Sequence, residues 1–251
     1  MLDKIITFSA HEEYVNYIDN ADKPCPIKTN IPDWYKKLKH SPGHKTIKGC
    51  MPFLDSLTSG YLLKVPQDMR ITHNITNPET GKKDSFAHAG QLDAGYFFSR
   101  MLNLAADPAR ETHNTNQLTG APHIEKNKNL PLYKILNPWI IKTPPGYSCL
   151  FLPPMNNADD RFSIIPAIVD TDKFTHEVNF PIVINGDKYE TLETIIRKGT
   201  PYVQVIPFKR DSWKMKIEGF TVKEIAPKKI LYFLKILDIY KEKYWSKKRW
   251  T

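Results

Sequence analysis

Short apolar runs separated by turn residues dominate the middle of the chain. Residues 60–65 form an apolar run that ends at Pro66, and residues 69–75 alternate apolar and polar side chains, as a half-buried strand does. More runs of this kind lie between Tyr133 and Ile217, and Gly186-Asp187 between two of them predicts a hairpin. The pattern therefore predicts a mainly β protein. We expect residues 143–206 to form consecutive strands of one β domain, with a turn at Pro145-Gly146 and with Val169 and Val203 buried.

The two ends of the chain follow a different pattern. Residues 31–38 predict a short helix, because a proline and an aspartate suit its start and two apolar side chains share one face. Pro227 predicts a second helix that runs to about Trp245 and is apolar around most of its circumference, so we expect it to be buried. The predicted organisation is an N-terminal arm with a short helix over residues 1–45, one β-rich domain over 46–226, and a C-terminal helix with a basic tail over 227–251.

Composition narrows the class of protein. Hydrophobic residues at 41% and charged residues at 25% are typical of a soluble globular protein. The 20 prolines outnumber the 11 glycines, which favours edge strands, turns and extended arms. Three cysteines without zinc spacing predict reduced thiols, and the chain has no apolar run long enough to suggest a signal peptide or a membrane span. We therefore expect a cytoplasmic protein without a membrane partner.

Positive charge is concentrated at the C-terminus. The formal net charge is +9, and residues 227–251 hold eight basic residues against two acidic ones. One interpretation is a solvated helix face, and the other is contact with nucleic acid or an acidic partner, including a viral one. Residues 244–250 mix cations with aromatic rings, as segments that bind single-stranded nucleic acid do.

Asp170 and Asp172 are the best candidates for chemistry. They follow the strand-like run of residues 164–169, and side chains two apart on an extended chain point to one side. Such a pair can hold Mg²⁺ through its oxygens or orient a water as a general base. The alternative is a polar turn in which an aspartate accepts hydrogen bonds from backbone amides.

A weaker metal site is suggested by His123, Glu125 and His176. Two histidines and a carboxylate with this spacing match the ligand set of non-haem iron oxygenases. The alternative is that these residues are ordinary surface side chains in a polar loop.

Residues 143–206 resemble the β-clip fold of trimeric dUTPases and dCTP deaminases. The resemblance rests on three segments: Pro144-Pro145-Gly146-Tyr147, Ala167 to Lys173, and Gly199 to Gln204. It implies that Asp170 activates the attacking water with Asp172 beside it, that Mg²⁺ is a cofactor, and that the chain forms a homo-oligomer, with a trimer expected. It also implies that the ligand is contacted by Asn156, Lys173 and Gln204.

A second resemblance covers residues 30–215. Segments 48–61, 178–180 and 199–201, with Asn137-Pro138-Trp139 and residues 206–211, are similar to an uncharacterised domain family of tailed cyanophages and some bacteria. That family brings no established activity. It implies that the protein is encoded by a phage and is found in the infected host cell or in the virion.

The patterns and resemblances together predict a fold and several functions. The fold is mainly β, either β-clip-like (dUTPase-like) or a related compact barrel or sandwich, with an N-terminal arm and a C-terminal helix. The leading functional hypothesis is a phage-type protein that binds a small polar ligand or nucleotide near Asp170 and Asp172. The alternatives are a structural virion or assembly protein and, third, an iron oxygenase.

Overall fold

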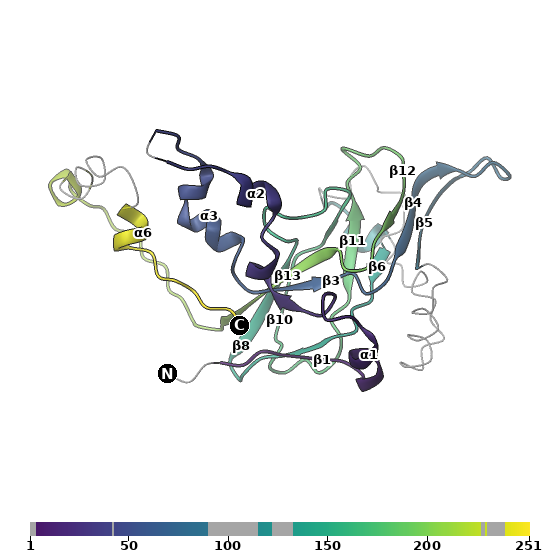
Figure 1. Ribbon diagram of the computed structural model, residues 1–251, viewed down its shortest axis with the longest axis horizontal. Helices are drawn as coiled ribbons and strands as arrows, with labels where there is room; N and C mark the ends of the chain where they lie inside the picture. The colour runs from purple at the N-terminus through teal and green to yellow at the C-terminus, as the bar shows by residue number, and fades with distance from the viewer. Residues whose placement is uncertain (1–3, 42, 90–114, 122–132, 227–228, 230–238) are drawn as a thin grey trace. The chain divides into compact units, whose positions relative to one another are not determined.

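A computed structural model describes residues 4–41, 43–89, 115–121, 133–226, 229 and 239–251. The chain divides into two units, one made of residues 1–25 and 60–209 and the other of residues 26–59 and 210–251 (Figure 1). Strand β2 (Cys25–Pro26) lies at the boundary. Among the described residues, no helix is both long and apolar enough to cross a membrane.

The first unit is mainly β and consists of antiparallel sheets. Its sheets have the strand orders β1-β7, β10-β8-β13-β3-β2, β6-β11-β9 and β12-β4-β5, and within the described residues they do not close into a barrel. Helix α1 (Glu12–Tyr17) and the 3₁₀ helix η3 (Thr115–Leu118) accompany them. The strands are β1 (Thr7–Ser9), β3 (Tyr61–Lys64), β4 (Met69–Thr76), β5 (Lys83–Ala89), β6 (Tyr133–Ile135), β7 (Ile140–Lys142), β8 (Tyr147–Leu152), β9 (Phe162–Ile164), β10 (Ala167–Val169), β11 (Phe180–Ile184), β12 (Leu192–Ile196) and β13 (Pro201–Lys209).

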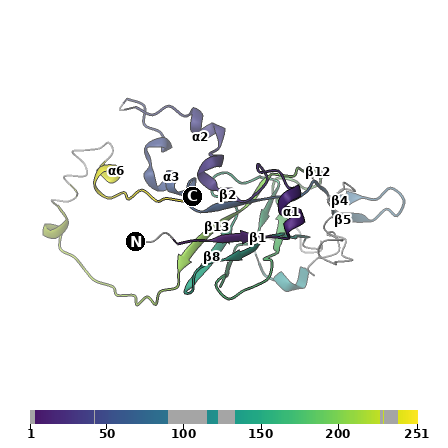
Figure 2. The same cartoon turned by 60° about the horizontal axis from the view of Figure 1, so that its bottom comes forward.

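Strand β13 is the centre of the five-stranded sheet. It pairs with β3 on one side and with β8 on the other, and Figure 2 shows β13 and β8 side by side. Strand β8 also pairs with β10. Val203 and Val205 of β13 are fully buried, and they share the core with Cys149 and Phe151 of β8. Gln204, which lies between the two valines and points to the opposite face, is also fully buried, so both faces of the sheet are covered at this point of β13.

Gly60 permits a close backbone approach to this central strand. Its φ is +83°, and a Cβ atom built on it would lie 2.1 Å from the carbonyl oxygen of Val205. A side chain at position 60 would therefore be both strained and in collision with β13. The glycine is needed where β3 begins.

The strand prediction for residues 143–206 is confirmed in its main points. Six strands from β8 to β13 lie within or begin in that range, Pro145-Gly146 forms a turn and Val203 is buried. Val169 is only half-buried, because β10 is at the edge of its sheet. The hairpin predicted at Gly186-Asp187 is wrong. The strands on either side belong to different sheets, since β11 pairs with β6 and β9 whereas β12 pairs with β4.

The N-terminal residues take part in the β-rich unit. The sequence pattern assigns residues 1–45 to an arm, yet β1 pairs with β7, and Tyr14 and Ile18 lie in the core of the first unit. Tyr14 belongs to the helix α1, which is thereby placed against the strands of this unit.

The second unit holds short helices and an extended segment. The helix predicted over residues 31–38 is confirmed as α2, and the described helices are η1 (Ile27–Asn30), α2 (Asp33–Lys37), η2 (Ile47–Gly49), α3 (Met51–Ser56) and α6 (Ile239–Lys243).

A short helical stretch, residues 222–226, precedes Pro227. Its Glu224 carboxylate accepts a hydrogen bond from the Thr221 backbone N–H at 2.8 Å. This contact is half of a capping box, in which a threonine is followed three residues later by a glutamate. Most of the apolar residues predicted for this helix, 230–238, lie outside the described residues.

Candidate functional site

Asp170 and Asp172 lie in a tight turn directly after β10. The backbone carbonyl of Asp170 accepts hydrogen bonds from the N–H groups of Lys173 and Phe174, both at 2.9 Å. The strand therefore ends at Val169, and the two carboxylates are presented by a turn instead of by an extended edge. This geometry corresponds to the polar-turn alternative.

Both carboxylates accept hydrogen bonds from the start of β8. The Ser148 hydroxyl donates to Asp170 Oδ1 at 2.7 Å, and the Gly146 backbone N–H donates to Asp172 Oδ2 at 2.8 Å. The register explains why these groups meet, because Val169 of β10 is opposite Cys149 of β8. The two aspartates thus link their own turn, through hydrogen bonds, to the Pro144-to-Tyr147 turn and to the start of β8.

A buried pair of threonines strengthens the same junction. The Thr143 and Thr171 hydroxyls lie 2.8 Å apart, and the Thr143 hydroxyl also donates to the Tyr147 carbonyl at 3.1 Å. The Thr171 hydroxyl reaches the Cys149 sulfur at 3.3 Å. Burial raises the pKa of the Cys149 thiol to about 11, so this cysteine is a buried neutral thiol.

The other predicted ligand-binding residues divide between two places. Lys173 is exposed in the aspartate turn. Gln204 is fully buried on β13, where its side-chain oxygen accepts a hydrogen bond from the Met155 N–H at 2.9 Å, next to Asn156 with its φ of +58°. Gln204 is opposite Leu152, the last residue of β8, whereas the aspartate turn adjoins Ser148. Ser148 and Leu152 are four positions apart along β8, so the two places are about 13 Å apart.

The predicted iron ligands are only partly described. His123 and Glu125 lie outside the described residues. His176 is exposed, and its ring makes an edge contact with Phe174 at a centroid distance of 5.7 Å. Within the described ranges, no cluster of three or more His, Cys, Asp or Glu residues is arranged to hold a metal ion.

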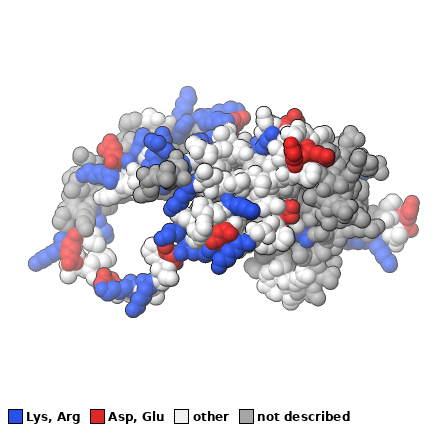
Figure 3. Space-filling view, turned by 90° about the horizontal axis from the view of Figure 1, so that it is seen from below, with Lys and Arg blue, Asp and Glu red and all other residues white. Residues whose placement is uncertain are grey.

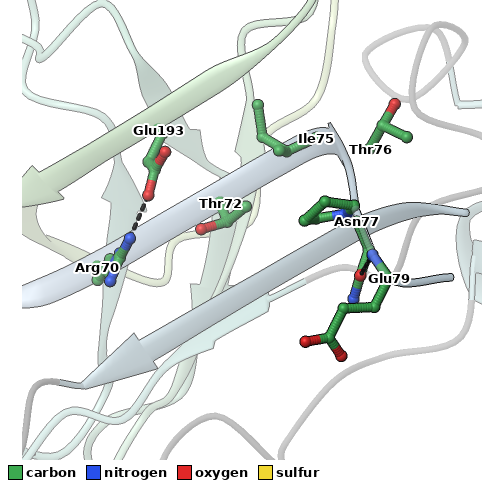
Figure 4. Close-up of a pocket in the computed structure, with 8 residues that line it drawn as sticks. Arg70, Thr72, Ile75, Thr76, Asn77, Glu79 and Glu193 are labelled. Carbon is green, nitrogen blue, oxygen red and sulfur yellow. Dashed lines mark hydrogen bonds and ion pairs between the residues drawn. The ribbon is translucent and has the colours of Figure 1, made fainter. Parts of the chain in front are cut away.

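A shallow depression lies beside β4 and β12 (Figure 4). It is lined by Arg70 and Thr72 of β4, by Glu193 of β12 and by the turn after β4, and it contains none of the predicted site residues. Arg70 and Glu193 form an ion pair across the two strands. The alternation in β4 predicts that Arg70 and Thr72 lie on one face of the strand. Their neighbour Glu193 depends on the pairing of β4 with β12, which the sequence pattern does not predict.

The extended arm, residues 210–221, is the least covered part of the described chain. No helix or strand is assigned to it, and residues 213–219 make no backbone–backbone hydrogen bond within the described part of the chain. Trp213 is 91% exposed, Met215 82% and Ile217 86%. These three side chains alternate with Lys214 and Lys216, as in an amphipathic strand.

The sequence analysis did not single out the arm as a candidate site. The alternation over residues 213–217 is visible in the sequence, but it predicts one more strand of the β-rich unit equally well. Only the exposure of the side chains separates the two cases.

The basic tail contacts a helix of its own unit. The Trp245 indole N–H lies 3.1 Å from both oxygens of Asp55 on α3, and the Lys248 ammonium lies 2.6 Å from Asp55 Oδ2. On the face drawn in Figure 3, basic side chains are interspersed with acidic ones. Nucleic-acid binding by this tail stays a prediction, and Lys248 at least has an acidic partner within the chain.

Comparisons with known proteins add no family. No protein-family model matches the chain, and no curated protein matches it. The dUTPase-like scaffold and the cyanophage domain family therefore stay predictions.

Proposed function

We propose that this protein is a structural assembly protein, in which the arm of residues 210–221 joins one copy of the chain to another. The observation that carries the proposal is the row of Trp213, Met215 and Ile217, which are at least 82% exposed in a segment that has no assigned helix or strand and pairs with no described strand. A monomer gains nothing from exposing three large apolar side chains in sequence, and such surfaces mark interaction sites.

The energetics favour a bound arm. Burying a side chain of this size contributes roughly 1.5–3 kcal/mol, so three of them offset much of the free energy that association and ordering of the arm cost. We further propose that this assembly is part of a virion or of the route to one, and the similarity to the cyanophage domain family supports this part of the proposal.

The test compares the two faces of the arm. In the full chain, Trp213, Met215 and Ile217 are all replaced by serine, and the control variant replaces Lys214 and Lys216 by serine. Analytical ultracentrifugation over a range of concentrations should show an oligomer for the natural chain and for the control, and a monomer for the apolar-face variant. A natural chain that is monomeric at every concentration would contradict the proposal, as would an apolar-face variant that still associates.

A second candidate function is binding of a small polar ligand or nucleotide near Asp170. It is favoured by one observation, the exposure of Asp170 and Lys173, which brings a carboxylate and an ammonium group to the surface of one turn. A Mg²⁺ titration, described in the Discussion, tests it.

A further inference from the structure

The open edge of the five-stranded sheet is the feature that the function proposed above leaves unexplained. Strand β10 is the last strand of the order β10-β8-β13-β3-β2, and no described strand pairs with its outer side. Ile168, at the middle of β10, is 63% exposed. Exposed sheet edges are templates for an added strand, and natural proteins usually protect them.

An apolar row crosses the sheet and ends at this edge. Ile168 of β10 is opposite Leu150 of β8, and Leu150 is opposite Ile206 of β13. Directly opposite residues share one face of a sheet, and this row lies on the face away from the core, because the neighbouring Cys149 and Phe151 are fully buried on the other face. The row therefore stops, at Ile168, where a further strand would continue it.

The arm has the side-chain spacing and the length of a strand that could add to this edge. Trp213, Met215 and Ile217 are two residues apart, so on an added strand all three would lie on one face. Residues 210–217 span about 26 Å when extended, which is enough for the arm to leave its own chain and lie along a short edge.

We infer that the apolar side of the arm adds to the outer edge of β10 of a second copy of this chain, and continues the row of Ile206, Leu150 and Ile168. This inference rests on the proposed function and names the receptor for the arm. A second copy is the occupant that the observations favour, because the same chain carries both an uncovered strand and an uncovered edge. Pro166, just before β10, and the turn at Asp170 limit the pairing to the three residues of the strand.

The experiment uses cross-linking between differently tagged full chains. Both chains carry Cys25→Ser and Cys50→Ser, and the buried Cys149 stays. One chain then carries Ile168→Cys and the other Met215→Cys, and mild oxidation should link the two. The control replaces Ile168→Cys by Ile195→Cys, a position on β12 that is also exposed, and this pair should not link.

A second measurement distinguishes failure of the proposed binding site, the β10 edge, from failure of the proposed assembly function. Ile168→Lys should raise the dissociation constant of the oligomer by about tenfold or more, whereas Ile195→Lys should leave it within about twofold. If the chain associates through its arm but the 168–215 pair does not link and Ile168→Lys has no effect, the receptor is wrong and the assembly function stands. If a single chain carrying both cysteines links only within itself, the second copy is excluded. A monomeric natural chain overturns both ideas.

Discussion

The turn at Asp170 and the arm at Trp213 differ in how far their side chains contact the rest of the described chain. The turn contains the residue types that chemistry needs, two carboxylates beside serine and threonine hydroxyls. Its oxygens accept hydrogen bonds from Ser148 and Gly146, and these contacts hold two turns together. In the arm, residues 213–218 alternate apolar and charged side chains, and the apolar side contacts little of the described chain.

This difference shows that residue type alone does not make a functional site. A carboxylate that accepts a backbone hydrogen bond has a structural task, and moving it costs stability. Trp213 is 91% exposed and contacts little of the described chain, so removing it should weaken association and leave folding intact. Substitutions in the body should therefore change the free energy of unfolding, and those in the arm should not.

The largest effect is expected from Gly60, at the start of β3 in the body, and Gly219 in the arm is its matched control. Gly60→Ala should lower the free energy of unfolding by about 2–4 kcal/mol, because the new methyl group requires a strained backbone and meets the Val205 carbonyl. Gly219→Ala in the arm, where nothing lies within 4 Å of the new atom, should change it by about 0.5 kcal/mol or less. Urea unfolding of both variants measures this. Equal effects would remove the contrast between body and arm.

A smaller effect is expected at the aspartate turn. Asp172→Ala removes the acceptor for the Gly146 N–H and should lower the free energy of unfolding by about 1 kcal/mol. Asp172→Asn keeps an oxygen that can accept this bond and should cost less. The matched change in the arm, Glu218→Ala, should be close to neutral in the same urea experiment. A neutral Asp172→Ala would mean that the carboxylate has no structural role.

The smallest effect is expected from Mg²⁺. If the two aspartates serve only their turn, adding Mg²⁺ should leave the thermal midpoint of the natural chain unchanged, as measured by differential scanning calorimetry. A stabilisation that is lost in Asp170→Asn would instead support the ligand-binding candidate, since a metal that binds the folded chain alone raises its stability. The Asp33→Asn variant, altered in a different unit, serves as the control.

The sequence by itself determined the mainly β class, most strands between residues 143 and 206, the turn at Pro145-Gly146 and the helix α2. These features follow from local rules: alternation of side chains, the φ of proline and glycine, and the residues that suit a helix start. The same rules gave both interpretations of Asp170 and Asp172, but they did not choose between them. That choice depends on Ser148 and Gly146, which are more than twenty residues away in the chain.

Only the tertiary structure decided which strands pair, which carboxylates are used and which apolar side chains are left exposed. β11 and β12 are neighbours in the sequence, yet they join different sheets, because pairing depends on partners far along the chain. Likewise, the pattern of residues 213–217 is that of any half-buried strand, and nothing local reveals that no described strand pairs with it. Burial and exposure are properties of the packed chain, and for this reason the sequence alone did not distinguish the arm from a strand.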